Sequence, residues 1–231
     1  MIKIFQIYYH ENQQKDLLDG FTPYKNNKKN IFVENQCISD IRHDKLTSDV
    51  SHVGLVSHKF HDKVLHKPEY IDLCKTIEEN LNADIFSPRL QGLWWSPIRE
   101  PRPIYFPNQL NMKDLAMPLL NDMADLNIIK KTTIGLWQKN YKTPIYCNFW
   151  VAKKEVFINY VDSFLSKVFE LIESYEKDNW IFTLNRSYAH PPPEEWQKSA
   201  GFEHYPAITF ILERLVNIYL QDRNLNHQAI L

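Results

Sequence analysis

The amino-acid sequence predicts an α/β domain in which a mainly parallel central sheet carries helices on both faces. Residues 2–9 form a nearly continuous apolar and aromatic run, which is typical of a buried strand in a parallel sheet. Strand-like runs then alternate with helix-like segments, as they do in α/β folds. With 231 residues, of which 44% are hydrophobic, the chain is long enough to bury one large core. We find no internal repeat or linker, so one domain over residues 1–231 is expected.

The expected strands after the first are short. They cover residues 31–33, 53–56, 84–88, 145–152 and 181–184. A stretch rich in Pro and Trp over residues 89–111 is expected to be a long loop with an edge strand at 104–106, because its prolines exclude one regular element.

Four helices are expected from apolar residues at helical spacing. They cover residues 69–82, 112–126, 154–175 and 207–220, and Pro118 is expected to kink or divide the second. Pro68 suits the first turn of the helix that follows it. The helix over 154–175 has the clearest apolar face, which is formed by Phe157, Val161, Phe164, Val168, Leu171 and Tyr175.

Charge and cysteine content argue against several classes of protein. Lys and Arg (27) nearly balance Asp and Glu (28), so no global basic field favours sequence-independent binding to nucleic acid. Cys37, Cys74 and Cys147 are widely separated, which argues against a disulfide framework and a structural zinc site. Cys74 and Cys147 are expected to be small buried side chains. No signal peptide and no bilayer-spanning apolar run is recognised, so a cytoplasmic location is expected.

The helix expected over 207–220 carries the first candidate for chemistry. Glu213, Arg214 and Asn217 are expected on the side opposite the buried stripe. A partly buried carboxylate has a raised pKa, so Glu213 can serve as a general base. The alternative is a solvated glutamate beside Arg214.

A second candidate follows the strand expected at 53–56. Ligands of open α/β sheets bind at the carboxyl ends of strands, so Ser57, Lys59 and Lys63 can face an anionic ligand such as a diphosphate. The alternative is an ordinary turn between a strand and a helix, with solvated lysines.

Histidines are dense in the first third of the chain. His58 and His61 are spaced to share one face of a helix, as a metal site requires, but no further ligand grouping completes the site. Capping or solvated histidines are the alternative. The other members of the group are His43, His52 and His66.

Two further positions have both a chemical and a structural interpretation. Asp84, at the start of an expected strand, can bind a divalent cation, although Asp is also common in turns for local reasons. Trp94 and Trp95 can form the wall of a sugar or base site, or anchor the long loop to the core.

Five short segments, which occur in order over most of the chain, are characteristic: IFQIYY at 4–9, GLVSHKFHDK at 54–63, DIFSP at 84–88, YCNFWVAK at 146–153 and FILERL at 210–215. Together they resemble a group of small bacterial and phage glycosyltransferases with a nucleotide-binding, GT-A type fold, relatives of enzymes of capsule and lipopolysaccharide synthesis. The resemblance implies transfer of a hexose or pentose from a nucleotide-sugar, with a UDP-sugar favoured, to a hydroxyl group.

The resemblance also implies roles on the donor side. The first strand and the turn after it, residues 6–10 with Gln6 and Tyr8 as donor-binding side chains, would hold the nucleotide base and ribose. The segment containing Ser57, Lys59 and Lys63 would lie near the donor phosphates, and Asn148 would face the transferred sugar or the acceptor.

On the catalytic and acceptor side, the resemblance makes Glu213 the base of an inverting transfer or the orienting residue of a retaining one. Arg214, with Trp94 and Trp95, would contact the acceptor. Asp84 would bind Mn²⁺ or Mg²⁺, but the sequence lacks the Asp-x-Asp motif that usually holds such a metal. Lysines can instead neutralise the leaving diphosphate, because a cation beside a developing anion has the same electrostatic effect.

The acceptor is left open between a glycan and a hydroxymethylated base in phage DNA, in the cytoplasm of a bacterium or of a phage-infected host. Two rival functions are also left open. One is a non-catalytic nucleotide- or sugar-binding module. The other is a nuclease or phosphohydrolase that uses the histidines, which predicts a tightly bound transition metal.

Overall fold

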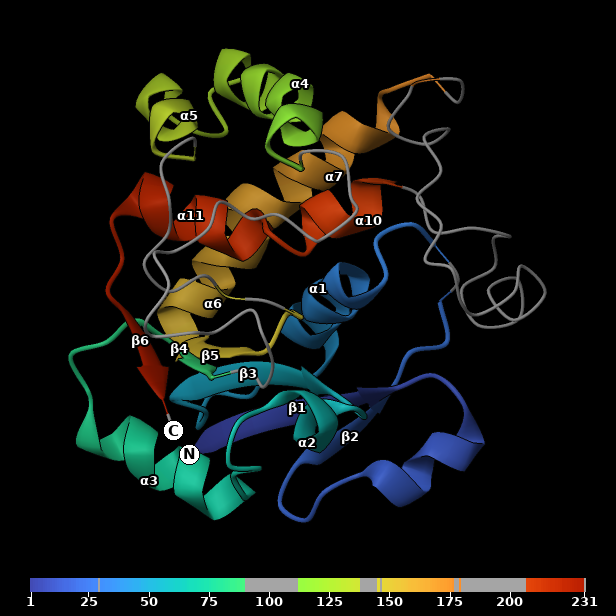
Figure 1. Cartoon of the computed structure of the whole chain (residues 1–231), viewed down its shortest axis with the longest axis vertical. Coiled ribbons are helices and arrows are strands. Elements are labelled where there is room, and N and C mark those ends of the chain that lie inside the picture. The colour runs from blue at the N-terminus through green and yellow to red at the C-terminus, as the bar shows by residue number, and fades with distance from the viewer. Residues whose placement is uncertain are drawn as a thin grey trace.

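The first strand, β1 (Ile2–Tyr8), lies inside a six-stranded sheet, with a neighbour on each side (Figure 1). The computed structural model describes residues 1–28, 30–89, 112–137, 145, 147–176, 179 and 207–230. Six of the seven β1 residues are buried, because both faces of the strand are covered by helices. The buried strand predicted from the apolar run at 2–9 is therefore confirmed.

The sheet has the strand order β2-β1-β3-β5-β4-β6. Strand β1 is parallel to β2 and β3, and β4 is parallel to β6, whereas β5 runs antiparallel to both of its neighbours. The predicted α/β fold with a mainly parallel sheet is confirmed, with β5 as the reversed strand. The bounds are Thr22–Lys25 for β2, His52–Ser57 for β3, Ile85–Pro88 for β4, Trp150–Lys153 for β5 and His227–Ile230 for β6.

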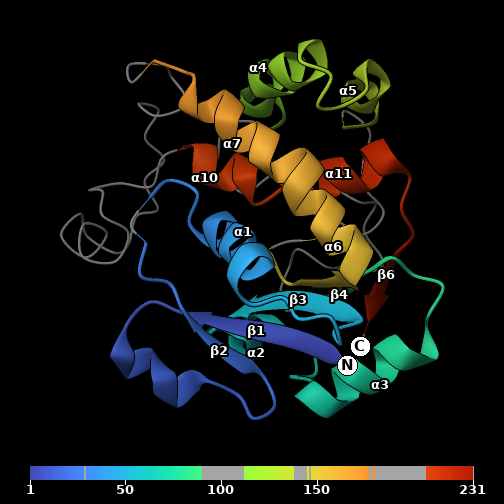
Figure 2. The same ribbon diagram turned by 180° about the vertical axis from the view of Figure 1, so that it is seen from behind.

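Helices cover both faces of this sheet, as the sequence predicts (Figures 1 and 2). Successive strand residues alternate between the faces: Ile4 packs in one core cluster and Phe5 in the other. The Ile4 face is covered by α2 (Phe60–Lys63) and α3 (Tyr70–Glu79), and the short 3₁₀ helix η1 (Glu11–Asp16) precedes β2. The Phe5 face is covered by α1 (Glu34–Asp44) and α6 (Lys154–Tyr160).

A further layer of helices packs beyond α1 and α6 (Figure 2). Helix α6 continues through a π-helical turn into α7, so the predicted helix over 154–175 is confirmed almost to its end. Its aromatic residues Tyr160 and Phe164 contact the Tyr219 ring, with centroids 5.2 and 5.3 Å away. The bounds are Val161–Leu165 for the π turn, Ser166–Glu173 for α7, Met112–Asp125 for α4, Lys131–Trp137 for α5, Ala207–Leu212 for α10 and Leu215–Arg223 for α11.

Three predicted elements differ from the structure. Residues 31–33 are not a strand but the turn before α1, because the Phe32 ring stacks on Phe169 at 4.0 Å instead of joining the sheet. The strand predicted over 145–152 begins only at Trp150, because Cys147 and Asn148 have left-handed φ values of 60° and 53°. The helix predicted over 207–220 is interrupted between α10 and α11. The segment around Pro118, by contrast, forms the single helix α4, which is one of the two outcomes predicted for it.

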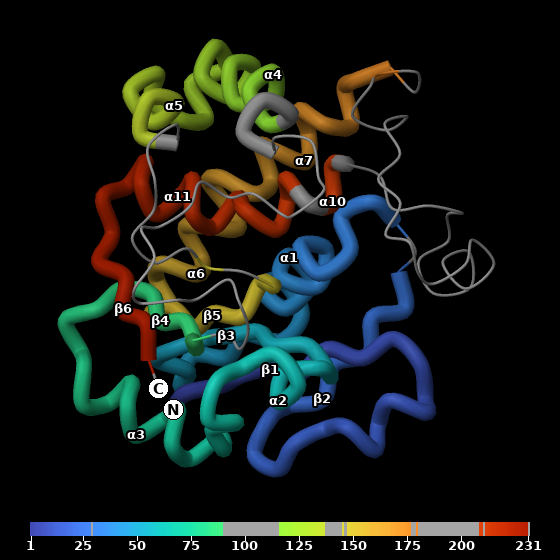
Figure 3. Tube along the Cα trace, in the orientation of Figure 1, coloured from blue at the N-terminus to red at the C-terminus, as the bar shows by residue number. Residues whose placement is uncertain are grey.

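Other sequence predictions lie outside the described residues. These are the strands at 104–106 and 181–184 and the side chains of Trp94 and Trp95. In the described part of the chain, no helix is long and apolar enough to cross a membrane. Strand β6 returns beside β4 and is the last strand of the order, at the end of the sheet opposite β2 (Figure 3).

Candidate functional site

The chain changes direction across the sheet between β1 and β3. From β1 it passes to β2 on one side and then returns to β3 on the other, so the carboxyl ends of β1 and β3 flank a topological switch point. Tyr9 follows β1 and His58 follows β3, and their rings meet edge to face with centroids 6.0 Å apart. Ligands of open α/β sheets bind at such points. This edge of the sheet is therefore the candidate site.

Helix α2, directly after β3, brings a lysine to this edge. The Lys63 ammonium lies 3.6 Å from the Cys147 sulfur and 5.7 Å from the centre of the Phe149 ring. Cys147 reaches the same edge because it precedes the antiparallel strand β5. Burial lowers the pKa of Lys63, but Cys147, Glu213 and Glu34 outweigh that effect and raise it. Lys63 is thus a permanent positive charge at the switch point.

Glu213 lies in the break between α10 and α11, and both of its carboxylate oxygens are engaged. Oε1 accepts the main-chain N–H of Cys147 at 2.5 Å, and Oε2 accepts a bond from the Arg214 guanidinium at 2.6 Å. Burial raises the pKa of Glu213, but Arg214, Lys63 and the Cys147 N–H together outweigh burial and lower it. The raised pKa expected for a general base is therefore not found.

Arg214 and Asn217 also differ from their expected positions on a polar helix side. Arg214 is fully buried and Asn217 is 1% exposed. Asn217 uses its amide to hold Ile145: Oδ1 accepts the Ile145 N–H, and Nδ2 donates to the Ile145 carbonyl, both at 2.8 Å. Glu213 and Asn217 together fix the backbone just before β5.

A second carboxylate, Glu34, reaches the site from the first turn of α1. Its Oε1 accepts a hydrogen bond from the Tyr9 hydroxyl at 2.6 Å. Burial raises the pKa of Glu34 and the negative charge of Glu213 adds to this, whereas the Tyr9 hydroxyl and Lys63 only partly offset it. The environment thus moves the pKa values of the two carboxylates in opposite directions. We call Tyr9, Glu34, His58, Lys63, Cys147, Asn148 and Glu213 the switch-point cluster.

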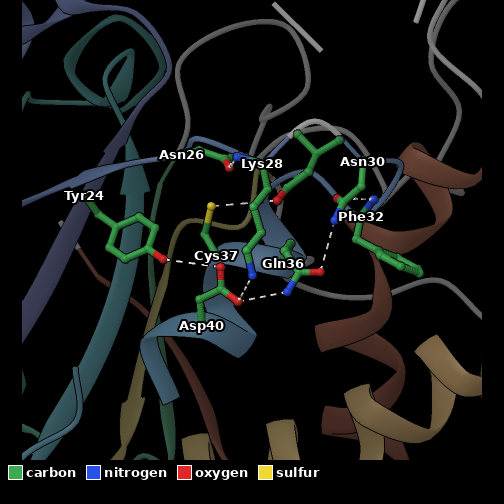
Figure 4. Close-up of polar contacts among 9 residues, drawn as sticks. Tyr24, Asn26, Lys28, Asn30, Phe32, Gln36, Cys37 and Asp40 are labelled. Carbon is green, nitrogen blue, oxygen red and sulfur yellow. Dashed lines mark hydrogen bonds and ion pairs between the residues drawn. The ribbon is translucent and has the colours of Figure 1, made fainter. Parts of the chain in front are cut away.

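A hydrogen-bond network links Lys28 and Asn30, which lie between β2 and α1, to Gln36 and Asp40 of α1, the helix that carries Glu34 (Figure 4). Asp40 Oδ1 accepts bonds from Lys28 Nζ at 2.7 Å and from Gln36 Nε2 at 2.9 Å. Asn30 extends the network by donating to Gln36 Oε1 at 3.1 Å. These bonds fix the approach to α1, and with it the start of the helix that carries Glu34.

The remaining residues predicted to bind the donor lie at or near the same edge of the sheet, but they differ in how exposed they are and in which groups they contact. Ser57 ends β3, and its hydroxyl accepts the N–H of Lys59, whose side chain is exposed. Tyr8 is the last residue of β1 and is 9% exposed. Gln6 is fully buried: Oε1 accepts the Leu18 N–H at 2.7 Å and Nε2 faces main-chain carbonyls. Gln6 therefore holds the loop before β2.

The predicted metal residue Asp84 lies apart from the cluster. It precedes β4, at the edge where β1 and β3 begin, and forms a 2.9 Å ion pair with Lys153. Burial raises the pKa of Asp84, but the Asn226 N–H and Lys153 outweigh burial and lower it.

His61 of the predicted histidine pair contacts the Pro68 carbonyl at 3.0 Å. No group of three His, Cys, Asp or Glu side chains in the described ranges can hold a metal ion.

The sequence predicts no site role for Glu34 or for the backbone of Cys147, whereas Tyr9 falls within residues 6–10, which the resemblance assigns to the nucleotide base and ribose. Glu34 was obscured because the apolar residues at 31–33 suggested a strand and hid the start of a helix. No sequence pattern marks Cys147 as a site residue, because it contributes its backbone N–H and not its side chain. Burial raises the pKa of its thiol to about 12.

Comparison with known proteins gives one informative similarity. No protein-family model matches the sequence, and no curated protein is significantly similar to it. A solved structure, the bifunctional glycosyltransferase WbbM in its apo form, is similar in fold, with a TM-score of 0.56 and 15% sequence identity. The match covers 99% of this chain but only 44% of the WbbM chain, so this chain spans less than half of that protein. The similarity shows a fold shared with a glycosyltransferase.

Proposed function

We propose that the protein is a glycosyltransferase that moves a sugar from a nucleotide-sugar donor to a hydroxyl acceptor. The observation that carries the proposal is the switch-point cluster, which brings the Lys63 ammonium near the carboxylates of Glu34 and Glu213 at the carboxyl ends of β1 and β3. Sugar transfer from such a donor needs a positive charge for the leaving diphosphate and an acceptor for the hydroxyl proton. The fold shared with WbbM supports the same conclusion.

In this proposal Lys63 neutralises the leaving diphosphate. Its ammonium is held at the edge by Cys147 and by the Phe149 ring, and nearby carboxylates keep it charged. Lys59, exposed one turn earlier, adds positive charge beside the same turn. Asp84 does not fit a metal role here, because it is paired with Lys153 at the opposite edge. We therefore assign no step to a metal ion.

The contacts of the two carboxylates favour Glu34 over Glu213 as the proton acceptor. Both oxygens of Glu213 accept bonds and its pKa is lowered, which weakens it as a base. Glu34 accepts a hydrogen bond from the Tyr9 hydroxyl and one from its own backbone N–H, yet its pKa is raised by burial toward the range in which a base is effective. Glu213 then holds the main chain at Cys147.

The finer features of the reaction remain those predicted from the sequence: a UDP-sugar, a hexose or pentose, and transfer in the cytoplasm to a glycan or to hydroxymethylated DNA. The two acceptors differ in their response to salt. Binding to DNA weakens steeply as salt rises, because phosphate contacts release counterions. Transfer to a glycan should not show that dependence.

The experiment that tests the proposed function is thermal unfolding with UDP-, GDP-, CMP- and dTDP-sugars, each with and without Mn²⁺. A donor present at about 100 times its Kd should stabilise the fold by about 2.7 kcal/mol. Stabilisation by at least one donor is expected. If no nucleotide-sugar changes the unfolding temperature, the proposal is wrong.

The second candidate function is a non-catalytic nucleotide- or sugar-binding module, which the full engagement of Glu213 favours. Release of nucleoside diphosphate from the bound donor separates the two. For an enzyme, Glu34→Gln should lower turnover by about 10²-fold or more while donor binding survives. Donor binding without turnover on any glycan or DNA acceptor would favour the binding module.

A further inference from the structure

Asn148 is a polar side chain of the switch-point cluster with a buried, unpaired oxygen. It is 1% exposed, and its Oδ1 accepts no hydrogen bond from any residue in the described part of the chain. Buried carboxamides normally have partners, because an unpaired one loses its bonds to water without replacement. Asn148 and Cys147 also both have a left-handed backbone, with φ values of 53° and 60°. Such an exception at a ligand-binding edge indicates a missing partner.

The backbone at Ile145 and Cys147, just before Asn148, is by contrast held by hydrogen bonds. Asn217 pairs with both main-chain groups of Ile145 at 2.8 Å, and Glu213 accepts the N–H of Cys147 at 2.5 Å. Three hydrogen bonds from the α10–α11 break and the first turn of α11 thus fix the residues just before Asn148. They hold the turn while leaving the carboxamide of Asn148 itself unpaired.

We infer that Glu213 and Asn217 are positioning residues that hold the backbone at Ile145 and Cys147 so that the Asn148 carboxamide binds a hydroxyl group of the donor sugar. This inference rests on the proposed function. An acceptor oxygen without a partner requires a donor, which a sugar hydroxyl provides and an ionised phosphate oxygen does not. A hydroxyl also accepts a bond from the amide nitrogen, so it matches either end of the carboxamide. The phosphates are matched instead by Lys63, the cation beside Cys147.

The test is calorimetric binding of a nucleotide-sugar and of its nucleoside diphosphate to the wild type and to Asn148→Gly. Glycine accepts the left-handed backbone without strain, so this variant removes the carboxamide and little else. We expect the nucleotide-sugar to bind about tenfold more weakly, and the nucleoside diphosphate to bind as before. Asn224→Gly is the matched control, because Asn224 has the same left-handed φ of 53° but is exposed at the end of α11.

The positioning role is tested by Asn217→Asp, which keeps the acceptor for Ile145 N–H but replaces the amide donor. It should reduce the preference for nucleotide-sugar over nucleoside diphosphate, and it should add no further loss in the Asn148→Gly background, because both changes act through one contact. A general structural role would weaken both ligands alike.

Equal weakening of both ligands by Asn148→Gly, or no effect on either, would overturn the assignment of Asn148 to the sugar. If the losses of nucleotide-sugar affinity caused by Asn217→Asp and Asn148→Gly add up in the double variant, the positioning role of Asn217 is wrong. A wild type that binds neither ligand would instead refute the proposed function, and the inference with it.

Discussion

The carboxylate of Glu213 accepts the main-chain N–H of Cys147 at 2.5 Å, across 66 positions of sequence. This bond ties the break between α10 and α11 to the segment that leads into β5. It places a negative charge beside Lys63 and opposite the buried guanidinium of Arg214. The sequence predicts that Glu213 is a base on a polar side of a helix, whereas in the structure its carboxylate holds the backbone of the site at Cys147.

Glu213→Gln should destabilise the protein in a pH-dependent way. The pKa of Glu213 is lowered in the folded state, so the unfolded chain binds the proton more tightly. Its contribution is therefore present above about pH 4.5, the ordinary glutamate range, and is lost as pH falls through the folded pKa. We expect a loss of about 1.5–3 kcal/mol at pH 7, typical of bonds to charged groups, measured by urea unfolding. A difference from wild type that stays constant or grows on acidification would contradict this.

Asp222→Ala should destabilise the fold by about 1–3 kcal/mol. Buried Asp222 accepts bonds from the Lys130 N–H and the Thr133 hydroxyl, both at 2.7 Å, and so joins α11 to the start of α5. Asp125→Ala is the control, since its ion pair with Lys131 at 3.3 Å is exposed and should contribute less than about 1 kcal/mol. Chemical denaturation of both variants measures the contrast, and equal losses would refute it.

Gly54→Ala should destabilise the protein by about 1–3 kcal/mol, as overpacking does. A Cβ at Gly54 would lie 2.5 Å from Val151 Cγ2 and 2.8 Å from the Trp150 carbonyl oxygen, where β3 pairs with β5. Gly135→Ala is the matched control, because a Cβ there meets nothing within 4 Å inside α5. Alanine in that helix should raise the free energy of unfolding by up to about 1 kcal/mol. The two variants should therefore change the free energy of unfolding in opposite directions. Similar decreases in both would be inconsistent with the close approach at Gly54.

Lys63→Met should weaken donor binding more than Lys59→Met. The Lys63 ammonium contacts the Cys147 sulfur and interacts with Glu34 and Glu213, whereas Lys59 lies on the turn after β3; both residues are exposed. We expect about a tenfold or greater rise in Kd for nucleoside diphosphate with Lys63→Met, as for a lost charge-assisted bond, and a smaller one with Lys59→Met. Calorimetry at physiological ionic strength measures both. A larger effect at Lys59 would move the phosphate site away from Lys63.

Strong periodic patterns made much of the fold predictable. Residues 4–8 and the apolar face from Phe157 to Leu171 are buried as their pattern predicts, because hydrophobic residues recur where the chain faces the core. The turn at 31–33 was misread because apolar residues also cover turns: Phe32 stacks on Phe169. The break at Glu213 was invisible because the helical pattern continues across it.

The candidate site was predictable only in part. Lys63 could be placed at a strand end by local rules, but the partners of Glu213 come from distant parts of the sequence. The local pattern of 207–220 gave no sign that Arg214 and Asn217 are buried, because the covering surface is tertiary. Asp84 satisfied a local rule for a metal ligand, yet the sheet places it at the opposite edge and pairs it with Lys153.

The central claim is that the ligand binds at the carboxyl ends of β1 and β3. Amide hydrogen exchange, measured with and without the nucleotide-sugar that stabilises the protein most, tests it directly. The account predicts slower exchange in residues 9–10, 58–63 and 147–149 when the donor is bound. Protection confined to the opposite edge, around Asp84 and Lys153, with none at the switch-point cluster, would contradict it.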